Sequence, residues 1–151
     1  MSNTSAYRAL LAAQQSLQLA TCNLDGTAEI SYAPFLLHDN RFYIYVSALA
    51  KHTGNLLRNH QAGIMLIQPE AEAENIFARQ RLSFNCRVSE IHRNSAEYAT
   101  LLELMRQRFG EIIQLLASLP DFHLLSLQPV AGQYVAGFGK AQSVDLSLAL
   151  A

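Results

Sequence analysis

The stretch LQLATCNLDGTAEISYAPFLLHDNRFYIYVS, residues 17–47, decides the fold of this chain of 151 residues. Its Asn-Leu-Asp-Gly segment at residues 23–26 is a strong turn signal between two extended segments, 17–22 and 28–37. A second turn at residues 38–40 precedes segment 41–47, which is rich in aromatic and β-branched residues. The stretch therefore predicts three antiparallel strands in a meander.

The flanking sequence predicts further strands and short helices. Helices are expected over residues 5–15, 48–59, 95–108 and 111–118, and strands over 63–68, 77–92, 122–128 and 132–144. Antiparallel strands dominate and no β-α-β alternation occurs, so we expect an α+β fold built on a β-barrel. The length fits one domain over residues 1–151, with residues 1–15 as an N-terminal helical arm.

Composition excludes several classes of protein. Half of the residues are apolar and 15% are charged, which excludes a disordered chain. The 11 basic and 12 acidic residues leave a net charge of −1, which argues against a nucleic-acid or membrane-surface binder. No apolar run approaches the roughly 18 residues of a membrane span, and the N-terminus does not resemble a signal peptide, so we expect a cytoplasmic protein. The two cysteines, Cys22 and Cys86, fit neither a disulfide framework nor a thiolate metal site.

Three arginines recur along the predicted strand 77–92. With side chains alternating between faces, Arg79, Arg81 and Arg87 share one face with Ser83 and Asn85, while the other face is apolar. This row is either a solvated face paired with nearby glutamates or a cleft for a phosphate or carboxylate ligand. The spacing leaves both interpretations open.

A second candidate site lies where strand 41–47 runs into helix 48–59. A helix start exposes backbone N–H groups that favour anions. Lys51 and His52 would add side-chain donors, and Ser47 and Asn55 belong to the same segment. The alternative is an ordinary exposed polar surface.

Asp121 and the histidines complete the set of candidates. Asp121, between Pro120 and Phe122 at the entrance of a strand, suits a turn or cap. The five histidines show no zinc-binding spacing, so a metal ligand cannot be assigned from spacing.

Six blocks of the sequence, in this order, resemble one known family. They are LQLATCNLDGTAEISYAPF, YIYVSALAKHTGNLLRN, IFARQRLSF, MRQRFGEII, LPDFHL and YVAGFGKA. Together they closely resemble haem-utilisation proteins of the HugZ/HutZ type, within the pyridoxamine 5′-phosphate oxidase-like, FMN-binding split-barrel superfamily. The resemblance covers about residues 17–144. It implies a split β-barrel that forms a homodimer with ligand sites at the subunit interface.

The resemblance also implies a ligand and roles for site residues. Proteins of this branch bind haem and, with reductant and dioxygen, open the porphyrin to release iron. Arg79 and Arg81 fall in a block suited to haem propionates or an interface ion pair. His52 matches a histidine of the branch by position. Asp121, the catalytic candidate, falls where the branch has an aspartate that hydrogen-bonds the iron-ligating histidine across the dimer.

FMN is the alternative cofactor. In flavin-binding relatives a Ser-Arg-Lys stretch holds the phosphate where this chain has Ala50-Lys51-His52. Those relatives supply further basic residues from the preceding strand, whereas residues 30–35 here include none, which disfavours FMN.

The iron ligand and the activity stay open at this point. The branch places its iron-ligating histidine in a C-terminal extension, and no histidine follows His123 in this sequence, so the metal ligand is unknown, with His52, His60 and His123 as candidates. A haem-degrading enzyme, an FMN-dependent oxidoreductase and a non-catalytic carrier are the functions that the sequence admits.

Overall fold

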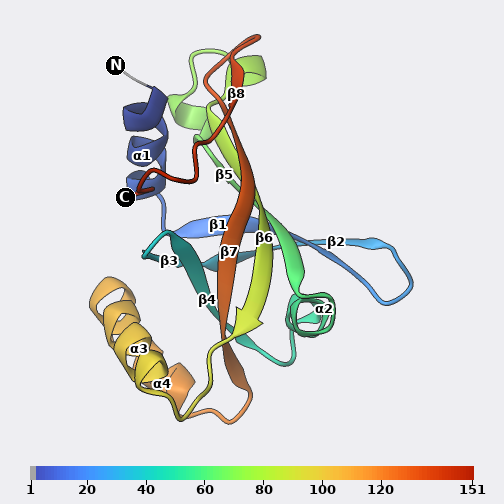
Figure 1. Cartoon of the computed structure of the whole chain (residues 1–151), viewed down its shortest axis with the longest axis vertical. Coiled ribbons are helices and arrows are strands. Elements are labelled where there is room, and N and C mark those ends of the chain that lie inside the picture. The colour runs from blue at the N-terminus through green and yellow to red at the C-terminus, as the bar shows by residue number, and fades with distance from the viewer. Residues whose placement is uncertain (1–2) are drawn as a thin grey trace.

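The computed structural model describes residues 3–151, which form a curled antiparallel sheet with helices at its ends and sides (Figure 1). The helices are α1 (Asn3–Ala13), α2 (Lys51–Asn59), α3 (Ala96–Phe109) and α4 (Ile112–Ala117), with two short 3₁₀ turns, η1 (Glu70–Glu72) and η2 (Ile76–Ala78). The strands are β1 (Ser16–Cys22), β2 (Ala28–Pro34), β3 (Leu36–His38), β4 (Arg41–Ser47), β5 (Gln61–Ile67), β6 (Arg81–Glu90), β7 (Phe122–Val135) and β8 (Ala141–Ser143).

The sheet curls into a half-barrel because of how its edges are joined. Its order is β2-β1-β5-β6-β7-β4-β3, with β8 paired to β7. The edge strands β2 and β3 are separated in the chain by Phe35 alone. A single residue cannot cross a flat sheet of this width, so the two edges must approach each other. The expected α+β class with antiparallel strands is confirmed.

Both hairpins of the predicted meander are confirmed, but its three continuous strands are not. β1 and β2 pair through the expected turn, from Ser16↔Pro34 to Cys22↔Ala28. The expected strand 28–37 divides at Phe35, however, and β4 pairs with β3 and β7 and not with β2. Asp39 and Asn40 both have positive φ, as a tight β3–β4 hairpin requires. Turn chemistry therefore identified the hairpins but not the long-range neighbours of β4.

The C-terminal strands also differ from prediction. Residues 122–128 and 132–144 were expected as separate strands, but β7 continues through Pro129 to Val135. The register against β6 shifts there, from Asn85↔Ala131 to Cys86↔Pro129. Such a bulge accommodates proline, which has no N–H for the ladder, without ending the strand.

Two apolar cores hold the fold together. The larger lies inside the curled sheet and includes Leu19, Ile44 and Leu82. The smaller packs α3 and α4 against the opposite face of β4 and β7. Helix α1, expected as an N-terminal arm, packs firmly on the sheet, since Tyr7 and Leu10 are buried in the larger core. Within residues 3–151, no helix is long and apolar enough to cross a membrane.

Candidate functional site

Ser47 and Asp121 lie together where β4 ends beside the start of β7. Ser47 pairs with Phe122, and the N–H of Ala48 donates to the Asp121 carbonyl at 2.8 Å. The Ser47 hydroxyl donates to Oδ2 of Asp121 at 2.6 Å. Two of the residues predicted for the site, far apart in sequence, are therefore in direct contact.

Lys51 and His52 occupy the first turn of α2, immediately after this strand end. Lys51 is exposed. His52 is half-buried, with Nδ1 2.8 Å from the Ser31 hydroxyl on β2. Burial lowers the pKa of His52, and the nearby Glu29 carboxylate opposes this shift. The imidazole is thus held against β2 in an environment that favours its neutral form.

This environment predicts a loss of stability in mild acid. The pKa of His52 is lower in the folded chain than in the unfolded one, so the unfolded chain binds the proton first as pH falls below about 6.5. The stability is present above that pH and is lost as pH falls through the folded pKa. We expect urea midpoints of His52→Gln to depend less on pH between about 7 and 5 than wild type does. His92→Gln, at an exposed position, should keep the wild-type slope.

Asn55 is buried and faces β1 and its turn. Its amide N–H groups donate to the Thr21 hydroxyl at 3.1 Å and to Oδ1 of Asn23 at 2.9 Å, and its oxygen accepts from Arg58 at 2.8 Å. Proposed from sequence as a cofactor contact, this side chain has its donors and its acceptor engaged within the protein. It joins α2 to the β1–β2 hairpin.

Truncation of Asn55 should therefore reduce stability. Asn55→Ala leaves buried partners without their hydrogen bonds, at an expected cost of about 1–2 kcal/mol in the free energy of unfolding. Chemical denaturation measures this cost, with the exposed-turn variant Asn94→Ala as the control. An unchanged midpoint for Asn55→Ala would contradict the bridging role.

The arginine row begins later than predicted. Residues 76–78 form η2, so Arg79 precedes β6 and is not part of the strand face. Its Nε and Nη2 donate to the Gln68 carbonyl at 2.9 and 2.6 Å, and Nη1 lies 3.7 Å from Oε1 of Glu70. Arg81 starts β6 and has one recorded hydrogen bond, from Nη1 to the Arg79 carbonyl at 3.1 Å. The Arg79 side chain thus bonds within the protein, while the Arg81 guanidinium has further N–H groups available to a ligand.

The sequence-predicted residues form two groups at opposite ends of the sheet. With 10 residues in β6 and a rise of about 3.3 Å per residue, Arg81 and Asp121 lie on the order of 30 Å apart. In Figure 1 β6 starts near the top, and α2 lies at the lower right, level with the arrowhead of β6. One small ligand cannot contact both groups of the same chain.

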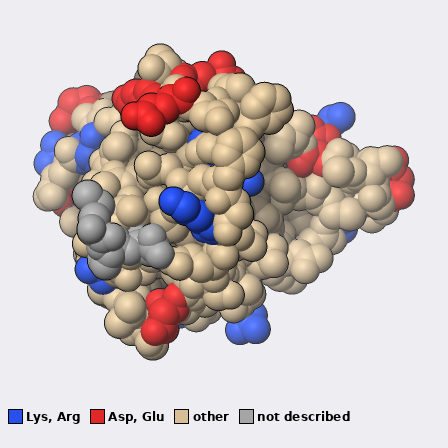
Figure 2. Space-filling model, turned by 90° about the horizontal axis from the view of Figure 1, so that it is seen from above, with Lys and Arg blue, Asp and Glu red and all other residues tan. Residues whose placement is uncertain are grey.

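Two exposed apolar side chains lie beside the arginine group and were missed from sequence. Ile76 and Phe77 of η2 are 54% and 80% exposed. The Asn75 side chain accepts the Phe77 N–H at 2.9 Å and so fixes this turn. Figure 2, viewed from this end, shows Lys and Arg side chains among uncharged residues, with acidic side chains gathered nearby. Because the sequence predicted a strand over residues 77–92, it did not predict that this segment begins with an exposed apolar turn.

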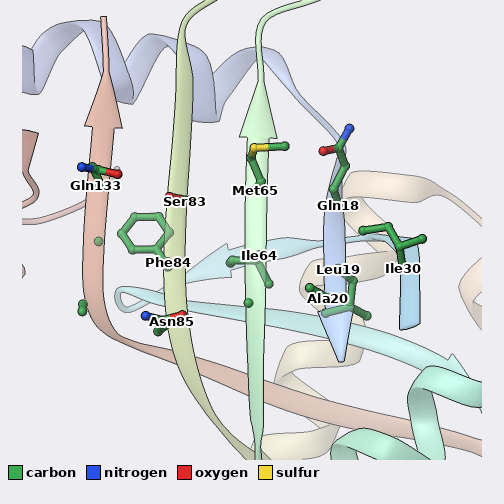
Figure 3. Close-up of a pocket in the computed structure, with 13 residues that line it drawn as sticks. Gln18, Leu19, Ala20, Ile30, Ile64, Met65, Ser83, Phe84, Asn85 and Gln133 are labelled. Carbon is green, nitrogen blue, oxygen red and sulfur yellow. The ribbon is translucent and has the colours of Figure 1, made fainter. Parts of the chain in front are cut away.

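The outer face of the sheet carries a shallow hollow of about 420 Å³ (Figure 3). Gln18, Met65, Ser83 and Gln133 border it on four strands. Its floor has little side-chain bulk where Gly63 and Gly132 lie, and Ile30 at its margin is 75% exposed. The face is large, uncharged and partly apolar. Side chains along residues 28–34 alternate between the two faces of the sheet, and this alternation could have identified Ile30 as a residue of the outer face.

The remaining histidines offer no clustered metal site. Residues 3–151 contain no group of three or more histidine, cysteine or acidic side chains that could hold a metal ion. His60 ends α2 in a left-handed conformation. His123 lies on β7, with Nδ1 2.6 Å from Oε2 of Glu90.

Comparison with known proteins agrees with this architecture. The family model described as pyridoxamine 5′-phosphate oxidase matches residues 4–136. A protein named heme oxygenase HutZ, from Vibrio cholerae serotype O1, is 42% identical over 132 residues, which cover 87% of this chain and 75% of that protein.

Solved structures give the same result. The crystal structure of HutZ from Vibrio cholerae, described as a heme storage protein, matches with a TM-score of 0.79 and 38% identity over 88% of this chain and 91% of that one. ChuZ from Campylobacter jejuni matches with a TM-score of 0.84 and 29% identity over 93% of this chain, which spans 58% of ChuZ. The chain therefore belongs to the pyridoxamine 5′-phosphate oxidase family, in the branch that includes HutZ.

Proposed function

We propose that this protein binds haem and serves haem-iron utilisation in the cytoplasm. The observation that carries the proposal is the 42% identity to a protein named heme oxygenase, over 87% of this chain. The crystal structure of HutZ from the same species, which matches at 38% identity, describes HutZ as storing heme. Binding is common to both descriptions, so the proposal concerns binding first and oxidative breakdown second.

The residues at the arginine end fit such a ligand. Haem combines a flat apolar ring with two carboxylates. Phe77 and Ile76 expose apolar surface next to the half-buried Arg81, whose guanidinium has no ion pair within residues 3–151. Arginine binds carboxylates through paired N–H groups. Arg81 would hold a propionate, while Arg79 stabilises the backbone that supports it.

The α2 end fits FMN less well. A flavin phosphate requires several converging cationic donors. On α2, Lys51 supplies one exposed ammonium group, and the facing strand β2 carries Glu29, whose carboxylate acts on His52. A carboxylate in this position repels phosphate. FMN stays the alternative that the family name suggests.

The two groups of site residues support a homodimer. Arg81 and Asp121 are too far apart to share a ligand within one chain, but a second copy can bring one end of the sheet to the other end of its partner. The uncharged hollow of Figure 3 and the exposed Ile30 and Tyr32 give a surface on which two copies could pack. We propose a split β-barrel dimer of single-domain chains (residues 1–151) with haem at the interface.

Each site residue then has a defined task. Haem, when bound, would supply a redox-active iron and a porphyrin ring open to oxidation by dioxygen in the presence of a reductant. Arg81 orients the ring through a propionate. His52, held neutral by burial, presents an uncharged imidazole beside the ligand. Asp121 would accept a hydrogen bond from an imidazole that ligates the iron and would fix the orientation of that ring.

Parallel titrations with hemin and with FMN test the proposal. We expect a saturable change in the hemin Soret band at one haem per subunit, no saturation with FMN, and a dimer by light scattering. Loss of the Soret band under ascorbate and dioxygen, with iron captured by a chelator, would show turnover. Binding without loss of the band would identify a carrier, and saturation by FMN alone would overturn the haem proposal.

A further inference from the structure

We propose that Ser47 is a positioning residue for Asp121: it holds the carboxylate by Oδ2 and leaves Oδ1 for the hydrogen bond to the haem-ligating imidazole of the proposed function. This inference rests on the proposed haem function. It changes the role given to Ser47 from sequence, which was direct contact with the cofactor.

The direction of the Ser47 hydroxyl is determined by its neighbours. The backbone N–H of Leu49 donates to Ser47 Oγ at 3.1 Å, and Oγ lies 2.6 Å from Oδ2 of Asp121. A carboxylate accepts only, so the hydroxyl proton must point to Asp121. A distance of 2.6 Å is typical of a hydroxyl donating to an ionised carboxylate. The Ser47 hydroxyl thus donates to Asp121 and accepts from the backbone N–H of Leu49.

The backbone around this pair is held at three further points. The Ala48 N–H donates to the Asp121 carbonyl at 2.8 Å, and Ala50 N–H donates to the Ser47 carbonyl at 3.2 Å. The buried Thr53 hydroxyl also donates to the Ser47 carbonyl, at 2.6 Å. Strand β4, helix α2 and the start of β7 therefore meet at Ser47 as one rigid junction.

The junction determines which oxygen of Asp121 is available. Within residues 3–151, Ser47 is the side chain recorded as bonding this carboxylate, and it uses Oδ2. Oδ1 is therefore the oxygen that a haem-ligating imidazole N–H would use, at an orientation determined by the bond from Ser47 to Oδ2. Without the Ser47 hydroxyl the carboxylate could rotate about its terminal torsion, which is a soft coordinate.

The test compares Ser47→Ala, Ser47→Thr, Asp121→Asn and the double variant Ser47→Ala/Asp121→Asn. We expect Ser47→Ala to weaken hemin binding by about tenfold and to move the Soret maximum in the same direction as Asp121→Asn. Ser47→Thr, which keeps a hydroxyl, should restore both values. The double variant should match Asp121→Asn within about twofold, because the two residues act as a unit.

A control separates positioning from stability. Thr53→Val removes the hydrogen bond to the Ser47 carbonyl but leaves the Ser47–Asp121 pair. It should lower the melting temperature without moving the Soret maximum. Wild-type hemin spectra for Ser47→Ala, or effects that multiply in the double variant, would overturn the role of Ser47 while leaving haem binding intact. Failure of the wild-type protein to bind hemin would overturn the proposed function and this inference together.

Discussion

Arg81→Ala is expected to weaken hemin binding by at least tenfold. A hydrogen bond between a guanidinium and a carboxylate contributes about 1.5–3 kcal/mol, which corresponds to roughly 10- to 150-fold in affinity. Arg81 makes one recorded hydrogen bond in the protein, to the Arg79 carbonyl, so its removal costs the fold little. Absorbance titration with hemin measures the change in dissociation constant, and thermal melting checks that the variant folds.

Arg87→Ala is the matched control. Arg87 lies on the same face of β6, six positions further along the strand and near its other end. If general positive charge attracted hemin, both variants would weaken binding equally and the effect would vanish at high salt. A tenfold loss for Arg81→Ala alone locates the propionate at the start of β6.

Gly132→Ala is expected to destabilise the fold by about 3 kcal/mol. Gly132 pairs with Phe84, and a Cβ at this position would lie 2.5 Å from Cδ1 and 2.6 Å from Cε1 of that ring. Phe84 is buried and packs on Phe42 with ring centroids 5.6 Å apart, so moving the Phe84 ring away from position 132 would disturb this packing. For a chain of this length, such a loss lowers the melting temperature by about 6–12 °C.

Gly63→Ala provides the comparison. Gly63 also lies in the sheet, next to the same strand, but its Cβ would meet only Cβ of Ala20 at 3.7 Å, an ordinary contact. Its stability should change by less than about 1 kcal/mol, the usual difference between glycine and alanine in a strand. Equal melting temperatures for the two variants would show that Phe84 does not require Gly132.

The sequence predicted the local elements well because their signals are local. The turn at residues 23–26 and the two helices expected over 95–108 and 111–118 occur within one residue of the expected bounds, since each depends on the backbone preferences of a few adjacent residues. The outward row of Arg81, Ser83, Asn85 and Arg87 was also correct, because alternation along a strand is geometric. Failures began where pairing is long-range, as with β4 and with the bulge at Pro129.

For the candidate site, too, local features were predictable from sequence and long-range contacts were not. By itself, the sequence determined the α+β class, the helix that ends at Asn59 (although it begins at Lys51 and not at residue 48) and, through resemblance, the family. Only the tertiary structure brought Ser47 to Asp121, sent Asn55 into the hairpin contact, and separated Arg81 from both by the length of β6. Sequence spacing specifies which side of its own element a residue occupies. Which elements become neighbours depends on how the curled sheet buries its apolar face, and that is a property of the whole chain.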